Sequence, residues 1–484
     1  MQLEHSRALL LAGHASGQTE QSLLEHILGV RVQLTVESQR PDLVATAALV
    51  LETLRRLPVA IALSPGCIRT ADVGRLTSAV ERVDPDLGIT VADDPTANLR
   101  IHLGRSLPGA DIVAMPERHG THLAGSKVTL RDTAPASGLG VMTTAALVCG
   151  EAFKQVAQVM PSRAVDHREL SWCPVTLSDD PTAAPDLHET TLALAIVGLG
   201  AIGTAVVRTL AMLPVGGAMM LVDPERFGPE NVGTYSLGGA AEARAKPWKI
   251  EMAANALPRF SSQGFAAPVE HVIETIDAGE APWPRIVLSG LDSASARREV
   301  QRLWPDRLID GATGDTMCGV HDVVAGSGGA CLRCLFPVRT GGPSSLERLV
   351  AATGLAPELL RYGDQPLTQG HLEALPPGRR ALLQGEIGKP ICGIAAAVGL
   401  TALPADDYRP SVPFVSQQAA CLMLGRLVAC ILGVERQANF VQYDALIGPQ
   451  ARTEEDRHVS PSCFCQQRPQ IVEAVRTRRT ATAL

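Results

Sequence analysis

The sequence predicts an α/β protein built around a doubly wound, parallel β-sheet. Three continuous apolar runs, at residues 192–198, 217–223 and 285–292, have the composition of strands buried on both faces. Helix-forming stretches lie between these runs, and such alternation is typical of a parallel sheet covered by helices. The first run leads into a glycine-rich turn and a helix, which places a candidate binding site at the end of that strand.

The overall composition fits a globular protein of several domains. The 484 residues suggest two to four domains, and hydrophobic and charged fractions of 46% and 19% allow large buried cores. The net charge of −7, without a basic run interleaved with aromatic residues, argues against nucleic-acid binding. We expect no signal peptide, because the first residues lack a basic head and a long apolar body, and no membrane span, because the longest apolar run is interrupted by glycines. Eleven scattered cysteines favour the reducing cytoplasm.

A linker at 174–189, rich in proline and acidic residues, divides the chain. The part before it also alternates between strand-like and helix-like stretches, but it contains no G-x-G-x-x-G pattern. An alanine-rich helical stretch at 137–161 closes this part, and a similar one at 410–433 lies near the end of the chain. We interpret this as an internal repeat of two related halves, and two unrelated helices of similar composition are the alternative.

A long polar segment, residues 338–390, interrupts the second half. It is rich in glycine and proline and matches no strand, although short helices are expected near 345–354 and 370–385. A segment of this length is either a lid over a site or disordered.

The glycine turn is formed by Gly198, Gly200 and Gly203, which follow a strand and open a helix. This G-x-G-x-x-G spacing lets a backbone approach a phosphate closely. Asp223, about twenty residues after the last glycine, ends the next strand, where an acid can bond ribose hydroxyls. The pattern serves a nicotinamide dinucleotide in many dehydrogenases and ATP in other enzymes, and a turn without any ligand is a third interpretation.

The residues that follow favour ATP. Asn231, Lys249 and Asp292 come in this order after Asp223. Transfer of an adenylyl group to a carboxylate needs cations near the phosphates and an acid to hold Mg²⁺, whereas a nicotinamide enzyme has no such need. A single lysine could equally lie on a solvated helix face, but the ordered set points to adenylation.

This stretch resembles the ubiquitin-activating superfamily, which includes ThiF, MoeB and bacterial activating enzymes. The family pattern is the glycine turn, then D-x-D-x(5)-N-x-x-R-Q, then a lysine, then an aspartate before a short helix. The matching positions are Asp223, Asn231, Lys249 and Asp292. The resemblance implies a Rossmann-like, ThiF-type domain that binds ATP with the three glycines and these four residues. It makes Lys249 and Asp292 catalytic, and Asp292 would also hold Mg²⁺.

Three positions depart from the family pattern. Glu225 replaces the second aspartate, Thr234 stands where the family has a phosphate-binding arginine, and Tyr235 replaces the glutamine. The missing charge must come from elsewhere. Arg226 and Arg244 lie nearby in the sequence, and an arginine of the other half or of a second subunit would also serve.

Two close cysteine pairs predict a metal site. The first pair is Cys331 and Cys334, and the second is Cys463 and Cys465. A C-x-x-C pair brings two thiolates to one ion, and a second pair completes a tetrahedral zinc site that has no open position and is therefore structural. The family usually has C-x-x-C twice, so the second spacing is a departure. Two unrelated pairs of reduced cysteines are the alternative.

Cys392 is the candidate nucleophile. It follows the long polar segment and precedes a small-residue run, where thioester-forming members of the family carry their catalytic cysteine. A thiolate there would attack an acyl-adenylate and give a thioester and AMP. Lys389 or a helix N-terminus could lower its pKa, and a buried, inert thiol is the alternative. Cys67 is a second candidate, whereas Cys421 and Cys430 are expected in the core.

The resemblance implies an enzyme that activates a ubiquitin-like protein. It would adenylate the partner's C-terminal glycine, load it onto Cys392 and pass it to a conjugating enzyme, in a bacterial conjugation system of the kind that can serve antiphage defence. Family members act as dimers, so an inactive, pseudo-symmetric N-terminal half is expected, and a homodimer is allowed. The alternatives are activation of a sulfur carrier, a nicotinamide-dependent oxidoreductase and a non-catalytic scaffold.

These assignments give five segments along the chain. They are an inactive adenylation-like domain (1–173), the linker (174–189), the ATP-binding adenylation domain (190–337), a crossover loop with the catalytic cysteine (338–409), and a closing helix with the zinc-binding end (410–484). The cofactors expected are ATP, Mg²⁺ and Zn²⁺.

Overall fold

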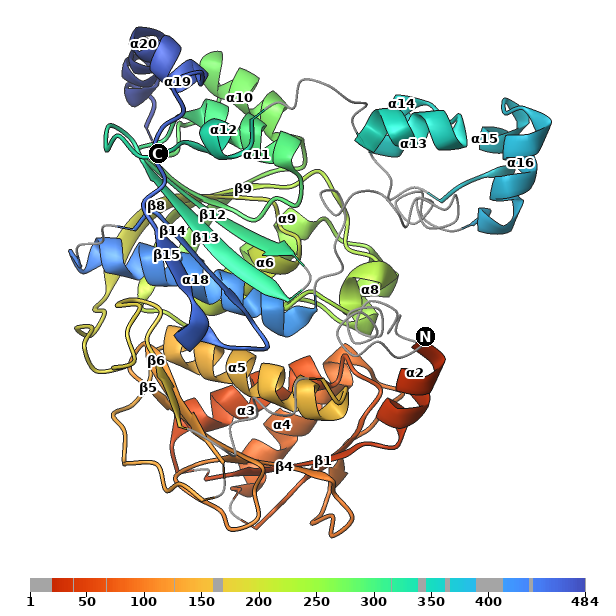
Figure 1. Cartoon of the computed structure of the whole chain (residues 1–484), viewed down its shortest axis with the longest axis vertical. Coiled ribbons are helices and arrows are strands. Elements are labelled where there is room, and N and C mark those ends of the chain that lie inside the picture. The colour runs from red at the N-terminus through yellow and green to blue at the C-terminus, as the bar shows by residue number, and fades with distance from the viewer. Residues whose placement is uncertain are drawn as a thin grey trace. The chain divides into compact units, whose positions relative to one another are not determined.

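The computed structural model describes most of the chain and forms two compact units. The described residues are 20–37, 39–66, 68–125, 127–159, 169–314, 316–337, 345–361, 366–388, 412–434 and 438–483. The larger unit comprises Met1–Phe336 and Pro410–Leu484, and the smaller comprises Pro337–Arg409. The larger unit contains two sheets (Figure 1). We call residues 20–189 the first half, and residues 190–336 with 412–483 the second half.

The first half is a seven-stranded sheet with its own helices. Its strands are β1 (Arg31–Val36), β2 (Ala60–Leu63), β3 (Thr90–Val91), β4 (Leu99–Leu103), β5 (Ile112–Glu117), β6 (Gly120–Ala124) and β7 (Leu170–Trp172). Its helices are α2 (Glu20–Leu28), α3 (Pro41–Leu54), α4 (Thr70–Val83) and α5 (Gly138–Val156). The strand order is β3-β2-β1-β4-β5-β6-β7. In this order, adjacent strands from β3 to β5 are parallel. The β5–β6 and β6–β7 pairs are antiparallel.

The second half is an eight-stranded sheet. Its strands are β8 (Thr190–Val197), β9 (Val215–Val222), β10 (Phe260–Phe265), β11 (Ile286–Ser289), β12 (Arg307–Gly314), β13 (Met317–Val324), β14 (Phe440–Asp444) and β15 (Thr453–Glu455). Its helices are α6 (Ala201–Leu210), α7 (Pro229–Val232), α8 (Ala240–Ala245), α9 (Lys249–Ala256), α10 (Val269–Asp277), α11 (Ala294–Val300), α12 (Leu332–Leu335), α18 (Pro413–Ile431), α19 (Phe464–Gln467) and α20 (Pro469–Thr480), with 3₁₀ turns at Gln301–Leu303 and Pro449–Ala451. The strand order is β10-β9-β8-β11-β12-β13-β14-β15.

The two sheets repeat one topology. Strands β8 to β14 take the same order as β1 to β7, with parallel neighbours up to the fifth strand and antiparallel neighbours after it. Helix α5 lies between β6 and β7 in the chain, and α18 lies between β13 and β14. The predicted α/β fold and the predicted repeat are therefore confirmed. The smaller unit is inserted between β13 and α18, where the first half has a short connection.

The central strand β8 shows why the sheet is buried on both faces. Its last four residues, from Leu194 to Val197, are all buried. Leu194 and Ile196 belong to one apolar cluster, and Ala195 and Val197 belong to another that includes α10. Because side chains of a strand alternate between faces, a continuous apolar run is what two covered faces require.

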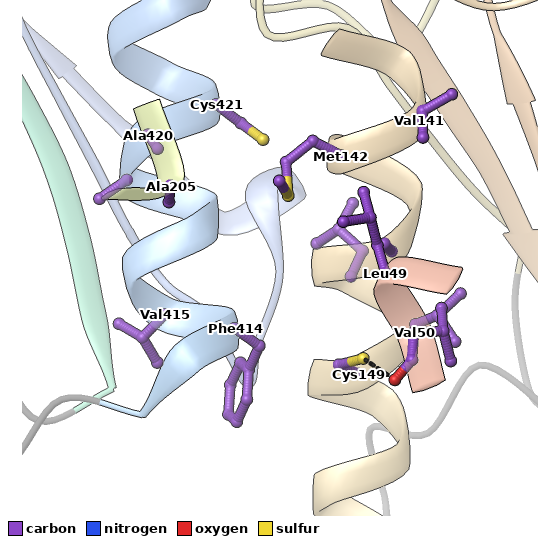
Figure 2. Packing of buried hydrophobic residues seen from close by; sticks show 14 of the residues in the cluster. Leu49, Val50, Val141, Met142, Cys149, Ala205, Phe414, Val415, Ala420 and Cys421 are labelled. Atoms are coloured by element: carbon purple, nitrogen blue, oxygen red, sulfur yellow. Dashed lines mark hydrogen bonds between the residues drawn. The ribbon is translucent and has the colours of Figure 1, made fainter. Parts of the chain in front are cut away.

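Helices α5 and α18 pack against each other and join the two halves (Figure 1). Figure 2 shows Phe414 and Cys421 of α18 near Met142 and Cys149 of α5, with Val50 of α3 beside Cys149. The rings of Phe153 and Phe414 lie 5.2 Å apart. Aliphatic and small residues fill most of this interface, and aromatic residues make up only 3% of the sequence.

Helix α18 also has the length and hydropathy of a membrane span, alone among the described helices. Within the larger unit, 89% of its apolar stretch is buried, as in a core helix. Cys421 is buried as expected, but the expectation for Cys430 is wrong, because this residue of the last helical turn is exposed.

The smaller unit is helical where it is described. It contains α13 (Ser345–Thr353), α14 (Pro357–Arg361), α15 (Gln369–Glu373) and α16 (Pro377–Leu383), followed by a 3₁₀ turn at Gln384–Glu386. Five leucines form its core, namely Leu355, Leu367, Leu372, Leu375 and Leu383. The short helices expected in this polar segment are confirmed.

Candidate active site

The glycine turn lies at the carboxyl end of β8, between this strand and α6. Gly198 has φ +85°, a left-handed conformation that favours glycine. A Cβ on Gly203 would lie 2.0 Å from the carbonyl oxygen of Gly198, so the third glycine lets the helix approach the strand. Gly200 caps α6 without a side chain. No side chain of the cap residue Gly200 accepts from the first N–H groups of α6. A phosphate could accept hydrogen bonds from such groups.

Asp223 braces the turn from the end of β9. Its carboxylate accepts hydrogen bonds from the main-chain N–H of Leu199 at 2.6 Å and of Glu225 at 2.9 Å. The side chain is buried, and this burial raises its pKa above the ordinary value. The carboxylate thus shapes the backbone that would face a nucleotide, in addition to the ribose contact that the sequence suggests.

Lys249, the first residue of α9, brings a cation to this edge. Its ammonium donates to the hydroxyl of Tyr235 at 2.9 Å and contacts the carboxylate of Glu225. Burial works to lower the pKa of Lys249, but Tyr235, Asp223 and Glu225 outweigh burial and raise it. Burial raises the pKa of Tyr235 to about 12. At neutral pH the site therefore holds an ammonium and a neutral phenol.

Asn231 and Thr234 lie on the short segment that carries Tyr235. The Asn231 side-chain oxygen accepts from the N–H of Gly228 at 2.9 Å, and its main-chain oxygen accepts from the N–H of Tyr235 at 3.0 Å. Thr234 is 1% exposed and its hydroxyl lies 3.5 Å from the Asn231 carbonyl oxygen. Asn231 therefore fixes the local turn, and Thr234 is buried where the family has an arginine.

Asp292 lies on the loop after β11. This strand pairs with β8 on the edge opposite to β9, which ends next to Asp223. A Cβ on Gly198 would come within 3.1 Å of the Gly290 carbonyl carbon, so this loop starts in contact with the turn. The Asp292 side chain is exposed and makes no hydrogen bond or ion pair with any residue that the structure describes. A lone exposed carboxylate fits Mg²⁺, which keeps most of its waters and binds substrate phosphates.

The arginines near the site in the sequence are engaged in other contacts. Arg297 pairs with Asp310 at 3.1 Å and lies over the ring of Phe336. The Arg226 guanidinium lies 4.0 Å from the centre of the Trp248 ring and donates to a main-chain carbonyl. Among the described contacts, neither guanidinium touches Thr234, Tyr235 or Lys249. Arg244 is exposed on α8.

The four cysteines meet at the N-termini of two short helices. Cys331 and Cys463 cap α12 and α19, and the four sulfur atoms lie within 4.8 Å of one another. Three sulfur pairs are separated by 3.6, 3.7 and 3.5 Å. Tetrahedral Zn–S bonds of about 2.3 Å place sulfurs about 3.8 Å apart, so the cluster fits zinc.

The environment of Cys334 supports metal binding. The thiol of Cys331 donates to Cys334 and lowers its pKa to about 4. The main-chain N–H of Ser460 donates to the same sulfur at 3.3 Å, and such donors commonly stabilise metal-bound thiolates. By contrast, burial raises the pKa of Cys421 to about 12, as expected of an inert thiol in the core.

The proposed nucleophile lies outside the described residues. Cys392, Lys389 and Cys67 all fall on unplaced positions, so their roles stay predictions. The segment boundaries at 338–409 and 410–484 likewise stay predictions.

The corresponding edge of the first half is filled by its own charges. At the start of α3, Asp42 accepts from the N–H groups of Leu43 and Ala136 at 3.1 and 2.9 Å. Arg40 pairs with Asp42 and donates to the carbonyl of Thr133. A carboxylate therefore already occupies the helix N-terminus that receives the phosphate in a glycine-turn site. At this edge the two halves therefore differ, although they share the fold.

The ThiF family matches residues 186–465, more than half of the sequence. The chain belongs to the ThiF family. The match starts just before β8 and ends at Cys465, so it includes the glycine turn, the smaller unit and all four cysteines. The first half lies outside the matched range, and its relationship to the ThiF domain is visible in the shared topology.

Solved structures similar to this ThiF family chain include E. coli MccB. The complex with MccA-N7isoASN is 13% identical, with a TM-score of 0.37, over 57% of this chain and 66% of that one. The ATP complex is 12% identical, with the same TM-score, over 75% of this chain and 99% of that one. This chain thus spans slightly less than two thirds of the first of these structures. No curated protein matches the chain.

Several site residues could not be assigned from the sequence. The spacing of the motif located Asp223, Asn231 and Lys249, but it gave no sign that Tyr235 and Glu225 contact the lysine. In the family pattern Tyr235 is only a replacement for glutamine. Arg56, which bonds to the same segment, lies 179 residues before Tyr235 in the sequence and belongs to no motif.

Proposed function

We propose that this ThiF family protein adenylates the C-terminal glycine carboxylate of a ubiquitin-like protein with Mg-ATP. The observation that carries the proposal is the buried ammonium of Lys249, which contacts Glu225. The N–H of Glu225 donates to Asp223, and the carboxylate of Asp223 also accepts from Leu199 in the glycine turn. Adenylation places negative charge on the phosphates as the bond to pyrophosphate breaks, and a fixed cation stabilises that charge. A nicotinamide cofactor needs no such cation, so the dehydrogenase alternative is disfavoured.

The proposed first step is a displacement at the α-phosphorus of ATP. A carboxylate oxygen of the terminal glycine attacks this phosphorus, and the bond to the bridging oxygen of the β-phosphate breaks. The products are an acyl-adenylate and pyrophosphate, which carries away the electron pair of the broken bond. Residues of the glycine turn would hold the phosphates, Lys249 would balance their charge and Asp292 would hold Mg²⁺.

The proposed second step uses Cys392. Its thiolate attacks the acyl carbon of the adenylate, AMP leaves and a thioester forms. A conjugating enzyme's cysteine then takes the acyl group by thiol exchange. We place this activity in the bacterial cytoplasm, as part of a ubiquitin-like conjugation system. Antiphage defence is one role of such systems. Without a reactive Cys392, the same first step would activate a sulfur carrier instead.

The first step is tested by ATP–pyrophosphate exchange. The full chain is incubated with ATP, Mg²⁺, labelled pyrophosphate and the ubiquitin-like protein encoded beside it. We expect label to enter ATP and to require the terminal glycine of that protein.

The Asp292→Ala variant is expected to slow exchange at least about tenfold, with partial recovery at higher Mg²⁺, because a metal ligand is lost. Glu274→Ala, on the exposed surface of α10, is the control. Full exchange in Asp292→Ala would contradict the metal role, and NAD binding without exchange would contradict the function.

The second step is tested by trapping the thioester. After incubation with ATP and the ubiquitin-like protein, we expect a covalent adduct that dithiothreitol releases, and we expect Cys392→Ala to lose it. Cys430→Ala is the matched control, because Cys430 is an exposed cysteine of the same chain. If Cys392→Ala keeps the adduct while Cys430→Ala loses it, the nucleophile has been assigned wrongly. If wild type exchanges pyrophosphate but forms no adduct, the sulfur-carrier alternative is favoured.

A further inference from the structure

The C-terminal end of α3, in the first half, reaches the candidate active site of the second half. Arg56 follows this helix and is 4% exposed. Its Nε donates to the carbonyl of Val232 at 3.0 Å, and its Nη2 donates to the carbonyl of Tyr235 at 2.5 Å. These two carbonyls flank Thr234, at the position where the family has its phosphate-binding arginine. One guanidinium from the first half thus bridges both ends of this segment.

The segment that Arg56 bridges also contacts the cation of the site. The hydroxyl of Tyr235 accepts from the ammonium of Lys249 at 2.9 Å. The carbonyl of Val232 ends α7, and a helix end has carbonyl groups that need donors from outside the helix. Arg56 supplies such a donor and at the same time fixes the main chain from which the Tyr235 ring projects.

The same turn of α3 also holds the helix that follows the glycine turn. Glu52 accepts from Arg208 of α6 at 3.0 Å and from Arg82 of α4 at 2.5 Å. The fit between the halves is close here, since a Cβ on Gly239 would lie 1.9 Å from the Arg82 carbonyl oxygen. The end of α3 therefore contacts both the helix after the glycine turn and the segment before Lys249.

We infer that Arg56 is a positioning residue for the nucleotide site. Through it the first half, whose own edge is filled by Arg40 and Asp42, holds the segment 232–235 of the second half in place. The guanidinium bonds to main-chain carbonyls, so it acts on the nucleotide through Tyr235 and Lys249. This inference rests on the proposed function for the nature of the ligand. The first half has no glycine turn of its own, but through Arg56 it would contribute to the reaction in the second half.

The adjacent residue Arg55 provides a matched control. Arg55 is 2% exposed and donates to the carbonyls of Leu57 and Val59, both in the first half. Lysine at either position keeps the positive charge but lacks the planar, rigid fork of the guanidinium. At Arg56 a single ammonium would have to replace two separate donor atoms, Nε and Nη2. Both variants therefore disturb buried hydrogen bonds, but only Arg56→Lys disturbs bonds to the active-site segment.

The test compares the two variants in melting temperature, ATP affinity by calorimetry and ATP–pyrophosphate exchange. Both are expected to melt at a lower temperature than wild type. We expect kcat/KM for ATP to fall on the order of 10- to 100-fold in Arg56→Lys, because small misplacements of catalytic groups have effects of this size. Arg55→Lys should stay within about twofold of wild type. Equal losses in both variants, or unchanged kinetics in Arg56→Lys, would overturn the inference.

A third variant tests the route through Tyr235. Tyr235→Phe keeps the ring and removes the hydroxyl that contacts Lys249. If Arg56 acts through this hydroxyl, Arg56→Lys will reduce ATP affinity less in the Tyr235→Phe background than in wild type, and additive effects would contradict the route. If Arg56→Lys does not fold, unchanged ATP affinity in Tyr235→Phe alone would overturn the inference. Should wild type bind ATP without exchanging pyrophosphate, the proposed function fails while these ATP affinities still decide the role of Arg56.

Discussion

We expect Lys249→Met to slow ATP–pyrophosphate exchange by roughly 100- to 1,000-fold, the loss typical of removing a preorganised charge from a transition state. Methionine keeps an unbranched apolar stem in the space of the lysine side chain, which is 2% exposed. The variant still lacks the ammonium, so Glu225 and Asp223 are left without their cation. A loss confined to kcat would show that the charge acts in the transition state, whereas a loss confined to KM would show that it only binds ATP.

The control for this experiment is Lys246→Met. Lys246 is exposed three residues earlier in the chain, so its replacement removes the same charge without altering the site. We expect exchange within about twofold of wild type in this variant. The raised pKa of Lys249 also keeps its ammonium charged well above neutral pH. A decline in wild-type exchange between about pH 7 and 9 that vanished in Lys249→Met would contradict this charge state.

The second large effect is expected at the cysteine cluster. We predict one zinc ion per purified chain, measured by elemental analysis, and loss of this ion in Cys463→Ser. Binding of an ion to the folded state stabilises it by mass action, and at about 1,000 times the dissociation constant this amounts to about 4 kcal/mol. The Cys463→Ser variant should therefore lose stability of this order in denaturant unfolding. Acidification should release the metal, because the ligating thiolates must be deprotonated.

The loss of zinc should first affect the C-terminal end of the chain. The cluster ties Cys463 and Cys465 to the residues around α12, and α20 follows directly. Helix α20 is also held by Arg479, which pairs with Asp277 at 2.8 Å. Hydrogen exchange should therefore increase around residues 457–468 before it increases in α20. Cys430→Ser is the control and should retain zinc; a protein purified without metal, or a Cys463→Ser variant that keeps it, would refute the site.

Much of the second half could be predicted because its signals are local. The apolar runs gave the strands, and the spacing of Gly198, Gly200 and Gly203 gave a turn that the structure confirms, with φ +85° at Gly198. The two cysteine pairs also met as predicted, although more than a hundred residues separate them. The two pairs could be predicted to come together because a tetrahedral zinc site needs four ligands, although the distance between them in the sequence gives no such indication.

Other features were not predictable from residue type. Arg226 and Arg244 were natural candidates for a missing cation because they are close in sequence, yet neither contacts Lys249 or Tyr235 among the contacts of the described residues. Cys430 was expected in the core because its helix is apolar, but it is exposed, although the three residues before it are buried. Helix composition predicts burial on average, and the packing around each residue decides it individually.

The sequence by itself predicted the α/β class, the phosphate-type turn and the two close cysteine pairs, because each signal lies in residues whose spacing is fixed by one strand, turn or helix. The repeat, for which two unrelated helices were the alternative, was decided by the strand order of the two sheets. Only the tertiary structure decided that Arg56 bonds to the segment around Thr234, that Tyr235 contacts Lys249, and that Arg40 and Asp42 fill the first half's own edge. Such contacts are formed when separate elements pack, and a side chain with several donors takes whichever acceptors that packing leaves unpaired.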